Sequence, residues 1–78
     1  MTAETMLLET ATEELAAGHD ARAIECLREL FELTTDVGVI DEIRDFAVRA
    51  HEAATGFHRL EWERLAIDAE SREALMPH

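Results

Sequence analysis

The sequence predicts an all-α protein, a small bundle of four helices joined as antiparallel hairpins. Helix-forming residues dominate, since the 78 residues include only three Gly, one Pro and no Tyr. Apolar residues recur at steps of three and four along most of the chain, which is the period of an amphipathic helix. The strict alternation that marks a half-buried strand does not occur. The short length indicates a single domain, residues 1–78.

The first helix is expected over residues 3–17. Thr2 is the expected N-cap, because its hydroxyl can accept a hydrogen bond from the first turn. Gly18 follows the last apolar residue and suits the left-handed conformation that ends many helices. Leu8, Ala11 and Leu15 form one apolar stripe, with Leu7 beside it. The opposite face is acidic, with no base among Glu9, Glu13 and Glu14.

The second helix is expected from about residue 20 to residue 34, with Asp20 as its N-cap. It is the most apolar of the four, because its hydrophobic residues cover well over half of a helical wheel (Ala23, Ile24, Cys26, Leu27, Leu30, Phe31 and Leu33). A helix of this kind must be buried on several sides. The short connection through His19, which we expect to be solvated, makes the first two helices antiparallel neighbours.

Residues 34–38 form the second break, and the third helix is expected to begin near Val39. Gly56 leaves two alternatives open. It either separates the third helix from a fourth over residues 57–75, or it lies inside one long helix, which would make three helices in all. The apolar stripe shifts its phase after Gly56, which favours a break. Residues 77–78 are expected to be a frayed tail.

The charge of the chain limits its partners. Eighteen acids oppose seven Arg, and Lys is absent, so the formal net charge is −11. An acidic chain is repelled by phosphate backbones and by anionic membrane surfaces, so we expect neither nucleic acid nor membrane as a partner. The absence of Lys has two explanations, and the sequence leaves both open. In a GC-rich genome Arg codons replace Lys codons, and in a cytoplasm of high salt concentration an acidic surface stays hydrated.

A cytoplasmic location is expected. No Lys or Arg precedes Arg22, so no secretory leader is expected, and no apolar run exceeds three residues. Cys26 is the single cysteine, which fits a reducing compartment. We interpret Cys26 as a small buried apolar residue.

The sequence offers no constellation that supports catalysis. It contains neither a Gly-rich phosphate loop nor a G-x-S-x-G turn, and no nucleophile is paired with a base. We therefore expect no enzymatic activity, no catalytic residue and no cofactor. His51 and His58 would share a face of a continuous helix, but a helical metal site needs more ligands than two histidines. No metal site is expected.

One hairpin resembles a known repeat. Gly18 and Ala23 have the separation of the turn Gly and the small residue in a tetratricopeptide repeat, and Leu27 takes the large apolar position. The chain departs from the pattern at Leu30, where the family prefers a small residue, and at Thr35, where it often has Pro. The resemblance covers roughly residues 4–36. It implies a helical-repeat fold that binds peptides or proteins.

Candidate partner-binding residues lie on the last helix. Phe57 and Trp62 are aromatic residues that either fill the core or anchor an interface. Two apolar stripes run along this helix, one through Trp62 and another through Leu60 and Ile67. A small domain can bury only one of them fully. The predicted partner-binding residues are therefore Phe57, Leu60, Trp62 and Ile67.

These observations predict a non-enzymatic helical module for protein–protein interaction. It would act as a homodimer or as a subunit of a larger complex, by presenting an apolar stripe to a partner helix. The alternative is an acidic inhibitor or regulator that neutralises a basic protein partner. The acidic outer face of the first helix would then be the working surface, and it would steer association electrostatically.

Overall fold

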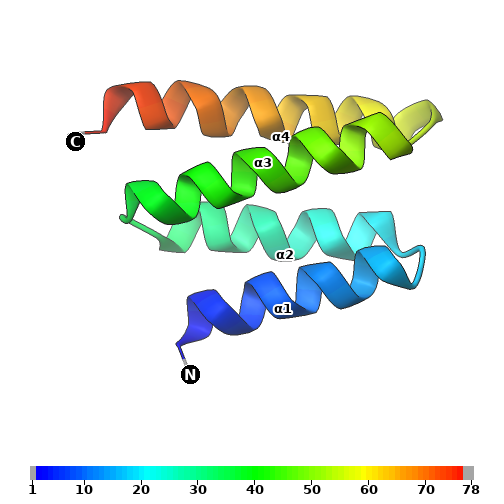
Figure 1. Ribbon diagram of the computed structural model, residues 1–78, viewed down its shortest axis with the longest axis horizontal. Helices are drawn as coiled ribbons and strands as arrows, with labels where there is room; N and C mark the ends of the chain where they lie inside the picture. Colours follow the sequence, from blue (N-terminus) through cyan, green and yellow to red (C-terminus); the bar gives the residue numbers. More distant parts are fainter. Residues whose placement is uncertain (1, 77–78) are drawn as a thin grey trace. The chain divides into compact units, whose positions relative to one another are not determined.

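The computed structural model describes residues 2–76, and this part of the chain contains four α-helices and no strand. The all-α prediction with four helices is confirmed, and the alternative with three helices is wrong. The expected tail at residues 77–78 lies outside the described residues. In chain order the helices are α1 (Ala3–Ala16), α2 (Asp20–Leu33), α3 (Val37–Ala53) and α4 (Gly56–Leu75), as Figure 1 shows.

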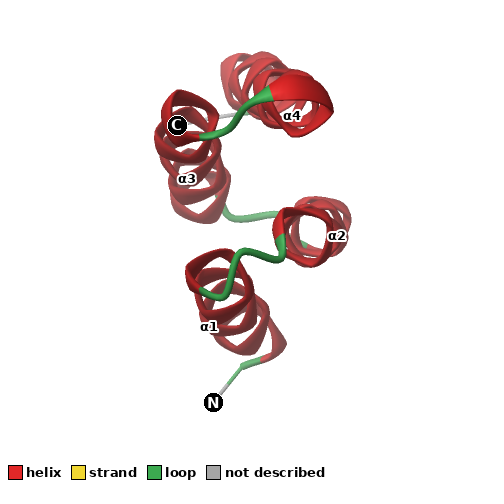
Figure 2. Ribbon diagram, turned by 90° about the vertical axis from the view of Figure 1, so that its right-hand side faces the viewer, coloured by secondary structure: helices red, strands yellow, loops and turns green. Residues whose placement is uncertain are grey.

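The chain divides into two compact units, Met1–Thr34 and Thr35–His78. Each unit is one antiparallel helical hairpin, α1 against α2 in the first and α3 against α4 in the second (Figures 1 and 2). The hairpin connectivity follows from the short turns within each unit, as the sequence predicts. The assignment of residues 1–78 to a single domain stays a prediction.

Local signals at both ends of α1 act as predicted. The Thr2 hydroxyl accepts a hydrogen bond from the backbone N–H of Thr5 at 3.1 Å, so Thr2 is the N-cap. Gly18 adopts a φ of 82°, the left-handed conformation that favours glycine. The next cap differs from the prediction, because Asp20 is already the first residue of α2 and His19 takes the N-cap position.

The first hairpin buries a small apolar core and one hydroxyl. The buried Thr34 side chain donates a hydrogen bond from Oγ1 to Oε2 of Glu4 at 3.3 Å, which ties the end of α2 to the start of α1. This contact joins residues far apart in the sequence and could not be read from either helix alone. The fully buried apolar side chains of this hairpin are Ala11, Ala23, Leu27 and Leu30.

Helix α3 begins two residues earlier than predicted, at Val37. The carboxylate of Asp36 accepts a hydrogen bond from the backbone N–H of Gly38 at 2.8 Å, so Asp36 is the N-cap. Gly38 therefore lies in the first helical turn and does not belong to the break. An Asp cap satisfies donors that would otherwise have no partner, which outweighs the weak helix propensity of one glycine.

The second hairpin holds the larger core. Trp62 of α4 is fully buried, and its ring centroid lies 5.7 Å from that of Phe46 on α3, with the two rings tilted by 34°. Tilted aromatic pairs at this distance pack favourably. The remaining apolar residues of this core are Ile40, Ile43, Ala47 and Ala50 from α3 and Leu65 and Ala69 from α4.

The turn between α3 and α4 gives a first testable prediction. Gly56 has a φ of 60°, and a side chain at this position would meet open space, so the backbone conformation alone sets the cost of a substitution. Gly56→Ala is expected to lower the free energy of unfolding by about 1–2 kcal/mol, whereas Gly56→Asn should cost less because Asn tolerates the left-handed region. Urea unfolding followed by circular dichroism measures both. Equal effects of Ala and Asn would contradict this explanation.

Candidate functional site

Helix α4 carries two apolar faces on opposite sides. Trp62, Leu65 and Ala69 are fully buried, as expected of the face that packs on α3. Leu60, Ile67 and Ala74 are exposed. Successive helical residues are about 100° apart, which places these two sets on opposite sides of the helix. The prediction of two stripes, of which the fold covers one, is confirmed.

The structure separates the four predicted partner-binding residues. Phe57, Leu60 and Ile67 are 72%, 62% and 47% exposed, whereas Trp62 is 0% exposed. Trp62 lies on the face that packs against Phe46, so its core role is the one the structure shows. The helical period already indicated this separation. Residues i and i+2 of a helix lie about 200° apart around its axis, and Trp62 is two positions after Leu60.

The exposed apolar face follows a heptad pattern. Its positions recur at alternating steps of three and four; four of them are apolar and two, Arg64 and Ser71, are polar. The full set is Phe57, Leu60, Arg64, Ile67, Ser71 and Ala74. We call these six residues the outer seam. Leu75 lies beside its end and is 86% exposed. The sequence-based prediction paired Phe57 with Trp62 as aromatic residues, but Phe57 lies on the same face as Leu60 and Ile67.

Acidic residues border the outer seam on both sides. Counted along the helix, Glu61 and Asp68 fall on one flank, and Glu63 and Glu70 fall on the other. Asp68 forms an ion pair with Arg64, the only base of the seam, and 3.3 Å separate Arg64 Nε from Asp68 Oδ1. The stripe therefore lies between two lines of acidic residues. On one of these lines Asp68 pairs with Arg64, and Oε1 of Glu61 lies 3.3 Å from Nδ1 of His58.

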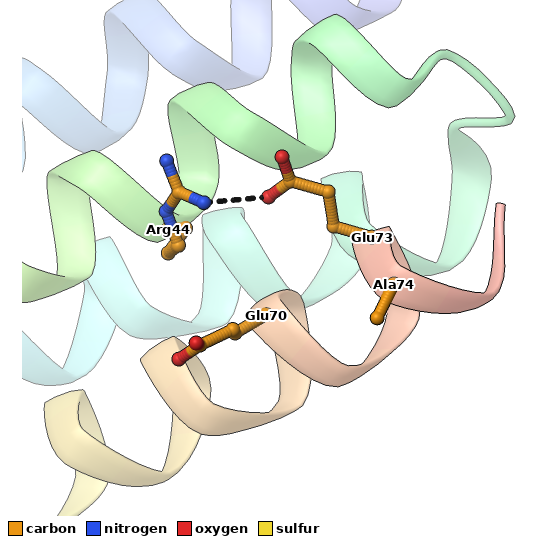
Figure 3. A pocket seen from close by; sticks show the side chains of 4 residues that line it. All are labelled: Arg44, Glu70, Glu73 and Ala74. Atoms are coloured by element: carbon orange, nitrogen blue, oxygen red, sulfur yellow. Dashed lines mark hydrogen bonds and ion pairs between the residues drawn. The ribbon is translucent and has the colours of Figure 1, made fainter. Parts of the chain in front are cut away.

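A shallow hollow of about 230 Å³ lies next to the C-terminal half of the seam, lined by Arg44, Glu70, Glu73 and Ala74 (Figure 3). Arg44 Nη1 lies 2.9 Å from Glu73 Oε2, which ties α3 to α4. The carboxylate of Glu70 lies apart from this ion pair in Figure 3. One of the two acids that line the hollow is therefore not bonded to its one base.

Arg44 is held by two further carboxylates on its own helix. Its Nη2 contacts Asp41, and it also lies 3.4 Å from Oδ1 of Asp45. Burial lowers the pKa of Arg44, but the carboxylates of Asp41, Glu73 and Asp45 together raise it above its ordinary value. The guanidinium group is thus a permanent cation whose charge is already compensated within the hairpin.

The acidic face of α1 differs in one point from the prediction. Glu9 and Glu13 are exposed, and within residues 2–76 neither has an ion-pair partner. Glu14 does have a neighbour, because its Oε2 lies 2.7 Å from Nδ1 of His19. His19 is therefore a hydrogen-bond partner of α1, although its side chain remains 60% exposed. The turn brings the two together, since the chain reverses direction between them.

The histidines of the second hairpin lie on different helices. His51 is in the last turn of α3, where its Nε2 accepts a hydrogen bond from Arg59 Nε at 3.4 Å, and His58 lies near the start of α4. Nowhere in residues 2–76 do three His, Cys, Asp or Glu side chains converge as metal ligands would. None of the helices in that range has the length and apolar character of a membrane span.

Cys26 is half-buried on α2. Burial raises the pKa of its thiol, and the negative charges of Glu14, Glu29 and Glu25 raise it further. The thiolate is the nucleophilic form, so this cysteine is a poor nucleophile near neutral pH.

No protein-family model matches this chain, and no curated protein and no solved structure matches it either. The resemblance of residues 4–36 to a tetratricopeptide repeat therefore stays a prediction.

Proposed function

We propose that this protein is a non-enzymatic helical interaction module and that the outer seam of α4 is its binding surface. The observation that carries the proposal is the position of the seam, on the side of α4 opposite the buried core. A helix needs one apolar face to join its own hairpin. The second apolar face therefore contributes little to the fold and gains stability when a partner removes it from water.

The size of the exposed side chains supports this role. Phe57, Leu60 and Ile67 are large, and burying one such side chain fully contributes roughly 1.5–3 kcal/mol. The seam extends from Phe57 to Ala74, about two and a half heptads, and a partner helix can lay its own apolar positions into a stripe of this length. The proposal includes both a homodimer and a larger complex, because either would cover the seam.

The test removes the apolar surface without touching the core. Leu60→Ser combined with Ile67→Ser should abolish association with the partner and leave the melting temperature nearly unchanged, because both side chains are exposed. Leu33→Ser combined with Val48→Ser is the matched control, since it removes exposed apolar residues from α2 and α3. Sedimentation at micromolar concentration measures self-association, and quantitative co-purification from the native host measures other partners. Equal behaviour of the two double variants would contradict the proposal.

A second candidate function is that of an acidic inhibitor or regulator of a basic protein. It is supported by Glu9 and Glu13, two exposed carboxylates on α1 that have no ion-pair partner within residues 2–76. Such binding would weaken steeply with salt, because exposed charges are screened. It would also survive the loss of Leu60 and Ile67. These two properties distinguish it from binding through the outer seam.

A further inference from the structure

We infer that the outer seam takes an amphipathic helix with basic flanks from a different protein, in preference to a second copy of this chain. This inference rests on the proposed function and adds the chemistry of the partner. It follows from the residues that border the seam. In paired helices the residues next to the apolar stripe face the corresponding residues of the partner and decide which partner fits.

All four residues that flank the seam between its first and last positions are acidic. Glu61 and Asp68 border it on one side, and Glu63 and Glu70 border it on the other. Lys or Arg at the flanking positions of a partner helix would meet an opposite charge on both sides. Such pairs contribute little individually, but together they discriminate between partners.

A second copy would meet like charges in either orientation. In a parallel pair of helices the two flanks cross, which brings Glu63 of one copy close to Asp68 of the other. In an antiparallel pair like flanks meet, so that Glu63 faces Glu70 and Glu61 faces Asp68. Like charges at these positions oppose association. The formal net charge of −11 on each copy adds long-range repulsion.

Arg64 in the seam and Arg44 at the hollow do not offset this repulsion. Arg64 lies in the middle of the seam, but its Nε is 3.3 Å from Oδ1 of Asp68 on its own helix. In a parallel homodimer the two copies of Arg64 would also face each other. Arg44, at the hollow beside the seam, is paired with Glu73 at 2.9 Å. Neither arginine is therefore available to bind the acids of a second copy without losing a carboxylate of its own.

The hollow at the end of the seam supplies a place for one basic side chain. Its two acids, Glu70 and Glu73, outnumber its one base, Arg44, and the Glu70 carboxylate lies apart from the ion pair (Figure 3). A Lys or Arg from a helix lying on the seam would reach Glu70 from beside Ala74. A carboxylate in the same place would be repelled.

The test uses two synthetic three-heptad helices that share Leu at their seam positions. One carries Lys at every flanking position and the other carries Glu. The full-length protein should bind the Lys peptide at least about tenfold more tightly than the Glu peptide, measured by calorimetry at moderate salt. Glu63→Lys combined with Glu70→Lys should remove most of this preference, because only Glu61 and Asp68 then remain acidic beside the seam. Glu9→Lys combined with Glu13→Lys is the control, since it changes the net charge equally but lies on α1, and it should keep the preference.

The outcomes separate the partner's chemistry from the proposed function. If the α1 control removes the preference as well, the net charge decides binding and the inference is wrong, while the proposed function of the apolar surface still stands. If the protein forms a dimer that depends on Leu60 and Ile67 and that the Lys peptide does not displace, the partner is a second copy, and the inference is again overturned. If Leu60→Ser combined with Ile67→Ser leaves Lys-peptide binding unchanged, the proposed function itself fails.

Discussion

Trp62→Ala is expected to lower the free energy of unfolding by about 3–5 kcal/mol, the usual cost of deleting a large buried aromatic side chain. Trp62 is 0% exposed and stacks at a tilt against Phe46. Its removal leaves a cavity between α3 and α4 that a hairpin of this size cannot fill by relaxation. A loss of this size is a large part of the total stability of a small domain. The second hairpin should therefore be partly unfolded at 37 °C in this variant.

Phe57→Ala is the matched control for Trp62→Ala. It removes an aromatic side chain from the same helix, but Phe57 is 72% exposed, so the free energy of unfolding should change by less than about 0.5 kcal/mol. Circular dichroism during urea unfolding is the suitable measurement, because fluorescence would lose its only Trp. If Trp62→Ala unfolds at the same urea concentration as Phe57→Ala, the assignment of Trp62 to the core is wrong.

The second expected result is a melting temperature that rises with NaCl. The formal net charge of −11 opposes compaction, and this repulsion is screened by salt. The Debye length falls from about 30 Å at about 0.01 M salt to about 3 Å at about 1 M, so only close neighbours still interact at high salt. Each 1 kcal/mol of repulsion relieved would raise the melting temperature by about 4–8 °C.

The ion pairs of the second hairpin work against this effect but are weaker. In the pair of Arg64 with Asp68 the arginine side chain is 72% exposed, and pairs with such an exposed member contribute little to stability. Screening these pairs therefore lowers the melting temperature less than screening the repulsion raises it. Helix α1 is the sensitive region, because Glu9 and Glu13 are exposed and lie four residues apart without a base between them. At low salt its amides should exchange first in hydrogen-exchange measurements.

Two controls separate screening from other effects of salt. Glu9→Gln combined with Glu13→Gln should raise the melting temperature at low salt and flatten its rise with NaCl. Tetramethylammonium chloride should act much like NaCl if screening is the cause, because it strengthens apolar association less than sulfate salts do. A melting temperature that stays flat or falls between 0.01 and 1 M NaCl would show that the ion pairs outweigh the repulsion.

The sequence by itself determined the four helices and both ends of the first, because these depend on neighbours in the chain. Thr2 caps α1 through a residue three positions away, and Gly18 ends the first turn through its own backbone. The break at Gly56 was predictable from the shift in apolar phase. The error at Gly38 was a local one, since the cap from Asp36 was present in the sequence and was not weighed against the glycine.

Tertiary structure alone decided which apolar face of α4 is the core and which is the candidate binding surface. Both faces have large apolar residues at helical spacing, so periodicity along one helix does not rank them. Packing against Phe46 buries Trp62 and leaves Leu60 and Ile67 exposed. The contacts of Thr34 with Glu4 and of Arg44 with Glu73 arise in the same way. Each joins residues some thirty positions apart, and their meeting depends on how two helices pack, which no single segment of the chain encodes.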